Sequence, residues 1–457
     1  MVATTSSPSQ SIADALALRR RPLTLLLLTT AYFFSYMDRQ ILAILQELIR
    51  KDLHLSDSQL GLLAGFAFAI FYATLGLPVA RLADRSNRVS IIAVALALWS
   101  LMTAVCGLAQ NFTQLLLARI GVGVGEAGSS PPSHSIIADL YPPERRAGAM
   151  GVYSLGVVLG TALGTMIGGF VAHAYGWRVA MFVVGLPGIV LAVLVKLLVV
   201  EPRRGLSDVQ IVAEGEQRGT IPPMSEGFRS LIADRAAFHL VMGVTITSLI
   251  GYGHAAFGPS FMQRSLGMSM LDVARVVAPV GAICGTISAV GGGWAANWVA
   301  KRWGLYAQSW LVLAMKAVGL PLSFLFFSLS DPWLAVPVYW ASVLLISSYL
   351  GPTFALIQGL APLRMRALWA AITLLVINLI GLGLGPTLIG VLSDALRPTY
   401  GEGSLRYAMM TFAAATPWAL YHYWRAGLLL KRRARGQVPG GQDSTRLSNS
   451  PNAKVEA

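Results

Sequence analysis

Four ionisable side chains lie inside stretches of this sequence that are otherwise apolar enough to sit in a membrane. Asp38 and Arg39 belong to the first stretch, in F-F-S-Y-M-D-R-Q, and Arg119 and Glu126 belong to R-I-G-V-G-V-G-E-A-G. An ionisable group at that depth costs at least about 2.5 kcal/mol on insertion scales. A chain keeps such a group where it faces a water-filled cavity or a partner, so the two sets predict a polar path through a membrane protein.

The two acids are candidates for proton coupling. Arg119 and Glu126 are seven residues apart, close to two helical turns, so both project from one face of a helix. Desolvation raises the pKa of a carboxyl group and a nearby arginine lowers it, so a conformational change that alters this balance moves a proton. We predict Glu126 and Asp38 as proton-coupling residues. The larger pKa change is assigned to Glu126, because Asp38 is expected to lie nearer the arginines.

The two arginines are candidates for substrate recognition. Arg39 and Arg119 are fixed positive charges, and a guanidinium suits bidentate binding of phosphate or carboxylate. We predict both as substrate-binding residues for an anion. The alternative is structural: the acids only anchor the arginines in buried ion pairs, with Asp38 as the partner of Arg119.

Long apolar helices must position these residues. Of 457 residues, 55% are hydrophobic and 12% are Asp, Glu, Lys or Arg, about half the charged share of a soluble domain. The net charge of +14 does not indicate nucleic acid as a partner, because the basic residues form short clusters between apolar runs. Cys106 and Cys284 each lie in an apolar segment, which disfavours a disulfide framework.

Apolar segments of about 20 residues predict twelve transmembrane helices. Their predicted limits are 22–46, 58–80, 88–109, 113–139, 148–172, 177–200, 236–262, 273–299, 304–328, 333–360, 365–391 and 404–430. The first is expected to remain uncleaved, because its apolar run exceeds signal-peptide length. Lys316 lies inside the ninth and Asp272 near the start of the eighth.

The predicted fold is all-α, with two pseudo-symmetric six-helix bundles at 22–200 and 236–430. A cytoplasmic tail (1–21), a cytoplasmic linker (201–235) and a basic, disordered tail (431–457) complete the chain. Basic residues concentrate in alternate loops, which predicts that both termini are cytoplasmic. Glycine-rich segments at 156–169 and 381–390 occupy matching positions in the two bundles. They support a duplicated transporter architecture, although most of these glycines are explained by close helix packing.

Several short motifs carry a family resemblance. They are Tyr36–Arg39, Asp84–Arg88 (D-R-S-N-R), Arg119–Ala127, Ile137–Leu140, Glu144–Arg146 and Glu201–Gly205. With them the chain resembles a major facilitator superfamily transporter and, within that superfamily, the Spinster family of lysolipid and sphingosine-phosphate transporters. Ala80 and Asn87 replace two glycines of the general superfamily loop, as is typical of Spinster-like members, and Asn297 weakens the corresponding loop of the second half.

The resemblance implies a secondary active transporter that works by alternating access and moves an amphipathic anionic, lipid-like substrate with a proton gradient as energy source. The first alternative is transport of a small organic anion or a drug. The second is a membrane-embedded lipid-modifying enzyme, which requires a nucleophile or metal constellation that the sequence does not show. We expect a monomeric multi-pass protein of the bacterial inner membrane, with membrane lipids as partners and no cofactor.

The cytoplasmic loops suggest a conformational latch. Asp84, Arg85 and Arg88 are explained in part by the positive-inside rule, but the family pattern favours a latch that pairs across the cytoplasmic face in the outward-open state. Arg145 and Arg146, on a neighbouring loop, are predicted to share this charge network.

Two other patterns are not given a function. Gly123-x-Gly125-x-x-Gly128 fits the dinucleotide fingerprint, but it lies in mid-helix without the strand that the fingerprint needs. His134 and Asp139 are five residues apart, which turns them about 140° away from each other on a helix and disfavours a catalytic pair.

Overall fold

The structure is a computed structural model, and it describes residues 8–207 and 223–436. All regular elements of these residues are helical. The outermost parts of the predicted tails (1–7 and 437–457) and residues 208–222 of the predicted linker lie outside the described residues.

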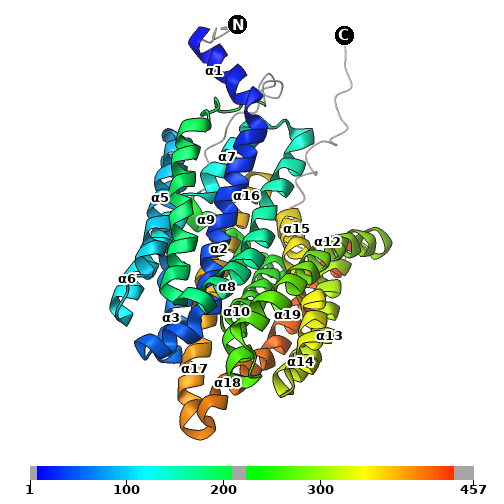
Figure 1. The fold of residues 1–457 in the computed structure, drawn as a ribbon. Helices are drawn as coiled ribbons and strands as arrows, with labels where there is room; N and C mark the ends of the chain where they lie inside the picture. Colours follow the sequence, from blue (N-terminus) through cyan, green and yellow to red (C-terminus); the bar gives the residue numbers. More distant parts are fainter. Residues whose placement is uncertain (1–7, 208–222, 437–457) are drawn as a thin grey trace, which may run out of the picture.

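Eight helices build the first half of the chain (Figure 1). They are α1 (Pro8–Arg19), α2 (Arg21–Leu53), α3 (Asp57–Ala64), α4 (Phe66–Arg85), α5 (Arg88–Cys106), α6 (Phe112–Glu126), α7 (Ser130–Leu140) and α8 (Pro143–Leu198). Polar loop residues fix where several of them begin, because their side chains accept hydrogen bonds from the first backbone N–H groups. Asn87 caps α5 and Asn111 caps α6 in this way.

The second half contains shorter helical pieces with more frequent breaks. They are α9 (Met224–Ala233), α10 (Arg235–Ser265), α11 (Met270–Asp272), η1 (Val273–Val277), α12 (Ala278–Trp303), α13 (Ala307–Ser328), α14 (Pro332–Ile346), η2 (Ser347–Tyr349), α15 (Leu350–Leu360), η3 (Leu363–Met365), α16 (Arg366–Val376), η4 (Ile377–Leu384), α17 (Gly385–Tyr400), η5 (Gly401–Gly403), α18 (Ser404–Ala414) and α19 (Thr416–Ala434). Asp234 caps α10 and Asp331 caps α14.

Eight helical stretches of the described residues are long and apolar enough to cross a membrane. The difference from the twelve predicted spans has identifiable causes. The stretch Pro143–Leu198 covers two predicted spans, and the chain turns inside it at Gly176, whose φ of +83° is accessible to glycine. The stretch Leu368–Ala434 likewise covers the last two predicted spans. The charged helices α2 and α6 are not among the eight, so the number twelve stays a prediction.

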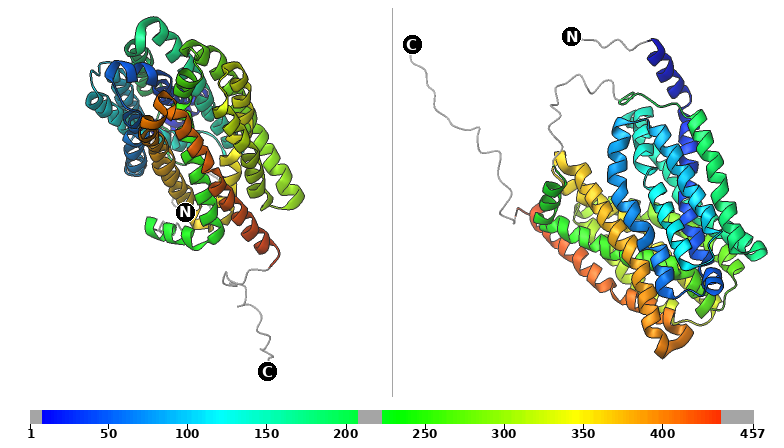
Figure 2. Two further views of the ribbon diagram at one scale, coloured as in Figure 1. Left: turned by 90° about the horizontal axis from the view of Figure 1, so that it is seen from below. Right: turned by 90° about the vertical axis from the view of Figure 1, so that its left-hand side faces the viewer.

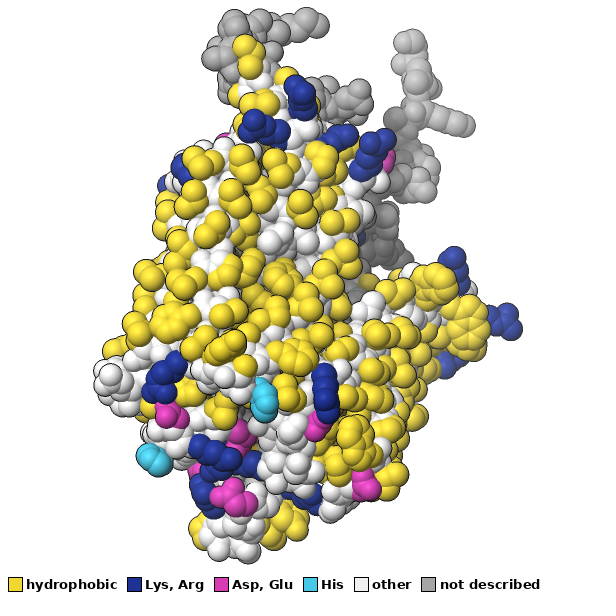
Figure 3. All heavy atoms as spheres, viewed as in Figure 1, with side chains coloured by type: hydrophobic (Ala, Val, Ile, Leu, Met, Phe, Trp, Pro, Cys, Tyr) yellow, Lys and Arg dark blue, Asp and Glu magenta, His cyan; other side chains and the backbone are white. Residues whose placement is uncertain are grey.

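The surface has the polarity of a membrane protein. Hydrophobic side chains cover the middle of the molecule, and charged side chains gather towards its two ends (Figure 3). Leu117, Leu197 and Trp294 are among the large apolar side chains that are more than half exposed. A soluble chain rarely leaves so much contiguous apolar surface in water, so the fold requires a lipid environment.

Close helix packing recurs in the two halves. A Cβ atom on Gly160 of α8 would lie 2.4 Å from the carbonyl oxygen of Phe33 on α2, and one on Gly385 of α17 would lie 2.4 Å from that of Leu249 on α10. Both glycines come from the segments that the sequence singled out. Small residues at such contacts let helix backbones approach, so these two glycines serve packing at equivalent positions.

The two halves meet at one end of the molecule. Helices α3 and α17 pack against each other, as do α2 with α10 and α4 with η4. Figures 1 and 2 show α17 beside α3 at the end away from the N-terminus. We call this the opposite end, and we call the end that carries α1 the terminal end.

Candidate functional site

Arg39 and Glu126 form an ion pair between α2 and α6. Arg39 donates hydrogen bonds from Nε and Nη2 to Glu126 Oε2 at 2.8 and 2.6 Å. Ser35, one turn earlier on α2, donates to the same oxygen at 2.8 Å. Glu126 is 1% exposed, whereas the Arg39 side chain is 17% exposed. The carboxylate is therefore buried and saturated on one oxygen, while part of the guanidinium stays accessible.

Aromatic rings hold the Arg39 guanidinium in place. Its central carbon lies 5.0, 4.8 and 4.6 Å from the ring centroids of Tyr36, Phe68 and Tyr72. Ring faces attract cations, more so where water is excluded. Arg119 approaches the same Phe68 ring at 5.5 Å, so the two arginines converge on one aromatic side chain.

Asp38 and Arg119 are buried without such a partnership. They are 1% and 3% exposed, and neither Asp38 Oδ1 nor Arg119 Nε has a hydrogen-bond partner. Within the described residues, the arginine that forms an ion pair at this site is Arg39, and its partner is Glu126. Glu126, and not Asp38, makes the direct contact with Arg39, because it reaches α2 from the end of α6. Asp38 lies within electrostatic range of both arginines, and its pairing with Arg119 stays a prediction.

Arg88 has a structural position inside the first half. Its side chain is fully buried and donates to Glu201 Oε1 at 2.6 Å, to Ser135 Oγ at 2.7 Å and to Asp139. These bonds tie the start of α5 to α7 and to the segment after α8. Because Asp139 is bound to Arg88, whereas His134 packs edge-on against Tyr153, the histidine and the aspartate belong to different environments.

The other predicted latch residues lie near the surface. Asp84, Arg85 and Arg145 are exposed, and Arg146 donates to the carbonyl oxygen of Ala138 at 2.8 Å. The structure thus brings Arg88 together with acids of its own half. The latch across the two halves stays a prediction for all five residues.

A buried charge network at the opposite end was missed in the sequence. Arg264 of α10 donates to Glu47 Oε1 of α2 at 2.6 Å and to both carboxylate oxygens of Asp57, at the start of α3, at 2.8 and 2.6 Å. Asp394 of α17 accepts from the backbone N–H groups of Asp57 and Ser58 at 3.1 and 2.7 Å. These bonds join the two halves.

The signal for this network was present but weak. Glu47, Asp57 and Arg264 each fall one or two residues beyond a predicted span, where charges normally face water. The three residues are predicted at the same end of three spans, and this shared position was the one sign in the sequence that they could form a network. In the structure their side chains are at most 6% exposed, which no single-helix pattern indicates.

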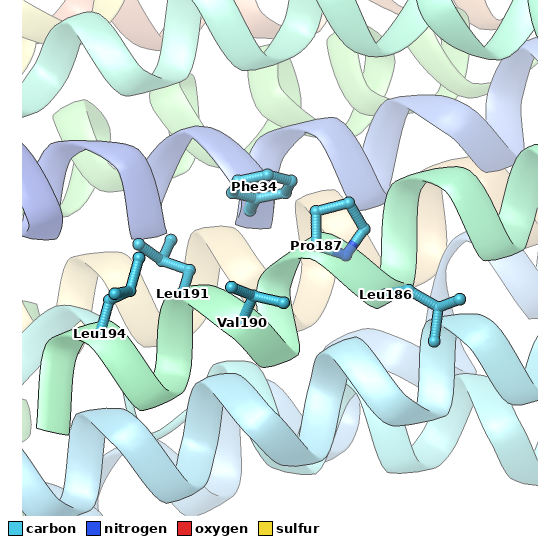
Figure 4. A pocket seen from close by; sticks show the side chains of 6 residues that line it. All are labelled: Phe34, Leu186, Pro187, Val190, Leu191 and Leu194. Atoms are coloured by element: carbon cyan, nitrogen blue, oxygen red, sulfur yellow. The ribbon is translucent and has the colours of Figure 1, made fainter.

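An apolar groove lies on the side of the first half (Figure 4). It has a volume of about 530 Å³ and is lined by Phe34 of α2 and by Leu186, Pro187, Val190, Leu191 and Leu194 of α8. No charged side chain lines it. This groove therefore offers apolar walls without the arginines that the sequence predicts for substrate binding.

The comparisons with known proteins agree with this architecture. The chain matches the Major Facilitator Superfamily over residues 28–386. An MFS-type efflux pump of Mycolicibacterium smegmatis is 34% identical over 402 residues, which cover 87% of this chain and 90% of that protein. A probable L-galactonate transporter of Escherichia coli is 27% identical over 285 residues, 61% of this chain and 62% of that protein.

A solved structure is similar over most of the chain. It is the crystal structure of a bacterial homolog to the human lysosomal transporter Spinster, in an inward-facing and occupied conformation. It superposes with a TM-score of 0.77 at 29% sequence identity and covers 89% of this chain and 97% of its own. The resemblance to the Spinster family that the motifs indicated is confirmed.

Proposed function

The chain belongs to the major facilitator superfamily and is a transporter rather than an enzyme, and from this membership we propose that it couples the movement of an amphipathic organic anion to protons. Transport proceeds by alternating access of a site between the two halves. The single observation that carries the proposal is the buried Arg39–Glu126 pair, in which the acid is enclosed and the base is partly accessible.

This pair gives a physical route to coupling. A substrate anion and the Glu126 carboxylate compete for the same guanidinium. Protonation of Glu126 removes its negative charge and frees Arg39 for the anion, so the proton and the anion favour each other's binding. Linkage of this kind is reciprocal, and it produces movement of both in the same direction. Asp38 lies beside the pair, forms no ion pair among the described residues and is 1% exposed, and we assign it as a second proton-carrying group.

The contact between the halves supports alternating access. Arg264, Glu47 and Asp57 close the opposite end with buried ion pairs. We infer that the structure represents the state that is closed at the opposite end and accessible from the terminal end. With the terminal end in the cytoplasm, as the basic loops predict, this state faces inward.

Two observations support an amphipathic substrate. The resemblance of this chain to the Spinster family implies a substrate of the lysolipid or sphingosine-phosphate type. The groove formed by Phe34 and α8 has the apolar character that an alkyl chain requires. The alternative, a small organic anion, is supported by the similarity to a probable L-galactonate transporter. Both substrates place an anionic group on Arg39.

Transport into proteoliposomes separates these alternatives. The purified protein is reconstituted with and without a pH gradient, and the uptake of a labelled lysophosphatidate is compared with that of labelled galactonate. Gradient-driven accumulation of the lysolipid is the expected result. Accumulation of galactonate alone would establish the small-anion alternative, and equal uptake with and without the gradient would refute proton coupling.

A further inference from the structure

Lys316 is a buried cation halfway along α13. It is the tenth residue of a 22-residue helix, about 14 Å from the helix start, and it is 6% exposed. It makes a cation–π contact, with Nζ 4.4 Å from the ring centroid of Tyr349, and His254 of α10 lies within its electrostatic range. Arg39 and Arg88 of the first half form ion pairs with nearby acids, whereas this lysine forms no ion pair with any residue that the structure describes.

The second half offers no acid at this depth. Between residues 236 and 430 the sequence contains four carboxylates, which are Asp272, Asp331, Asp394 and Glu402. Asp331 caps α14, Asp272 and Glu402 lie in the short elements α11 and η5, and Asp394 of α17 binds the start of α3 at the opposite end. An ammonium group without a counter-charge is costly inside a membrane and by default marks a functional site.

Hydrogen-bonding groups gather beside the lysine. Tyr349 lies in η2, where the helix between α14 and α15 is interrupted at Ser348, whose ψ is +18°. The Tyr349 hydroxyl is 3.0 Å from Ser248 Oγ of α10. Thr245, one turn earlier on the same face of α10, is buried and its Oγ1 has no hydrogen-bond partner. A cation, two linked hydroxyls and an unused hydroxyl are the groups that bind an oxyanion.

The lysine site and the Arg39 site face a common layer of tyrosines. Tyr252, one turn beyond Ser248 on α10, packs against the hydrophobic core of the first half. It also lies within electrostatic range of Arg39 and Tyr36 on one side and of Tyr349 on the other. Tyr252 is thus an electrostatic neighbour of both the Arg39 site and the Tyr349 ring beside Lys316.

We propose that Lys316, with Tyr349, Ser248 and Thr245, forms an anion-binding subsite in the second half. A substrate carboxylate or phosphate is held there and by Arg39, so that one ligand contacts both halves. This inference rests on the proposed function, because it assumes that the substrate is an anion. A ligand that contacts both halves stabilises the conformation in which both contacts are made, so its binding favours closure of the two halves around it.

Binding to the full-length protein in nanodiscs tests the subsite. Calorimetry measures the affinity for galactonate, a small carboxylate, and for lysophosphatidate, an amphipathic phosphate, with galactose as the neutral comparison. We expect Lys316→Met to weaken binding of the anion about 10- to 100-fold, the value of a hydrogen bond to a charged group. Lys316→Arg should recover part of this affinity, because it keeps the charge.

A matched control shows whether the loss of affinity is specific to Lys316 or follows the removal of any lysine that lies beside aromatic rings. Lys431 lies 5.6 and 5.0 Å from the ring centroids of Tyr306 and Trp310 near the end of α19. Lys431→Met also removes a cation–π contact, but at the end of α19, so it should leave the affinity for the anion unchanged. A loss of affinity in this variant equal to that in Lys316→Met would overturn the assignment.

Three further outcomes distinguish a failure of the Lys316 subsite from a failure of the proposed function. A folded Lys316→Met that binds the anion like the parent, while Arg39→Met does not, overturns the subsite and leaves the proposed function standing. Failure of the parent to bind either anion refutes the proposed function itself. Unfolding of Lys316→Met assigns the lysine a structural role and counts against the subsite. In that event Ser248→Ala, which keeps the charge, still tests it, because a several-fold loss of affinity for the anion is expected.

Discussion

Replacing Arg264 by Gln removes the positive charge that holds the two halves together at the opposite end. In the parent, three hydrogen bonds of 2.6 to 2.8 Å join Arg264 to Glu47 and Asp57, and the arginine side chain is 6% exposed. Loss of one member of a buried ion pair costs about 3–5 kcal/mol, because the remaining charges stay buried without a partner. Glu47 keeps its contact with Arg50 at 3.3 Å and Asp57 keeps the hydrogen bond from Ser393 at 2.7 Å, so we expect the lower end of this range.

This loss of stability affects mainly the state in which the opposite end is closed, and much less the state in which it is open. The bonds of Arg264 cross from the second half to the first, so they exist only while the opposite end is closed. A shift of about 3 kcal/mol changes the ratio of the closed to the open state at least about 100-fold. Arg264→Gln is therefore expected to open the opposite end in a large fraction of molecules.

Distance measurements between spin labels report this opening. Lys51 at the end of α2 and Thr399 near the end of α17 are both exposed, and each can carry a label as a cysteine after Cys106 and Cys284 have been replaced. The expected result is a second, longer distance in Arg264→Gln. The matched control is Arg275→Gln, since the Arg275 side chain is 60% exposed and pairs with Asp272, three residues earlier in the chain. An exposed pair is worth at most about 1 kcal/mol. An unchanged distance distribution in Arg264→Gln would refute the assignment of this network as the lock of the opposite end.

Three other substitutions have defined outcomes. Under the proposed coupling, the proton and the anion favour each other's binding in the parent, so the affinity for the anion should fall as pH rises. Glu126→Gln should abolish gradient-driven accumulation, keep exchange, and make this affinity independent of pH; accumulation with the parent's pH dependence would contradict the coupling role. Asp84→Asn should slow transport at unchanged expression if the loop is a latch, and a parental transport rate would remove the latch. Arg88→Met should lower the free energy of unfolding by about 3–5 kcal/mol, because Arg88 is fully buried between two acids; thermal unfolding measures this, with the exposed Arg85→Met as the control that should change little.

Much of the site could be predicted from the sequence because its signals are local. Hydropathy identified the membrane-embedded helices, and the charged residues within them identified Arg39, Arg119, Asp38 and Glu126 as unusual. The glycine segments predicted close helix contacts, and Gly160 makes one of them. Each inference uses a property of one helix: its apolar length, its charge at a given depth, or the spacing of its small residues.

The tertiary structure alone decided which charges meet. Two acids and two arginines allow more than one pairing, and the choice of Glu126 for Arg39 depends on the rotation and depth of α6 relative to α2. These are set by contacts with other helices, such as Gly123 of α6 against Phe68 of α4 and Gly125 of α6 against Trp99 of α5. The same holds for Arg264, whose partners lie more than 200 residues away in the chain, and for Lys316, whose isolation depends on where the acids of the second half lie. Helix periodicity fixes the direction of a side chain about its own axis, but the identity of its partner is a property of how the helices pack.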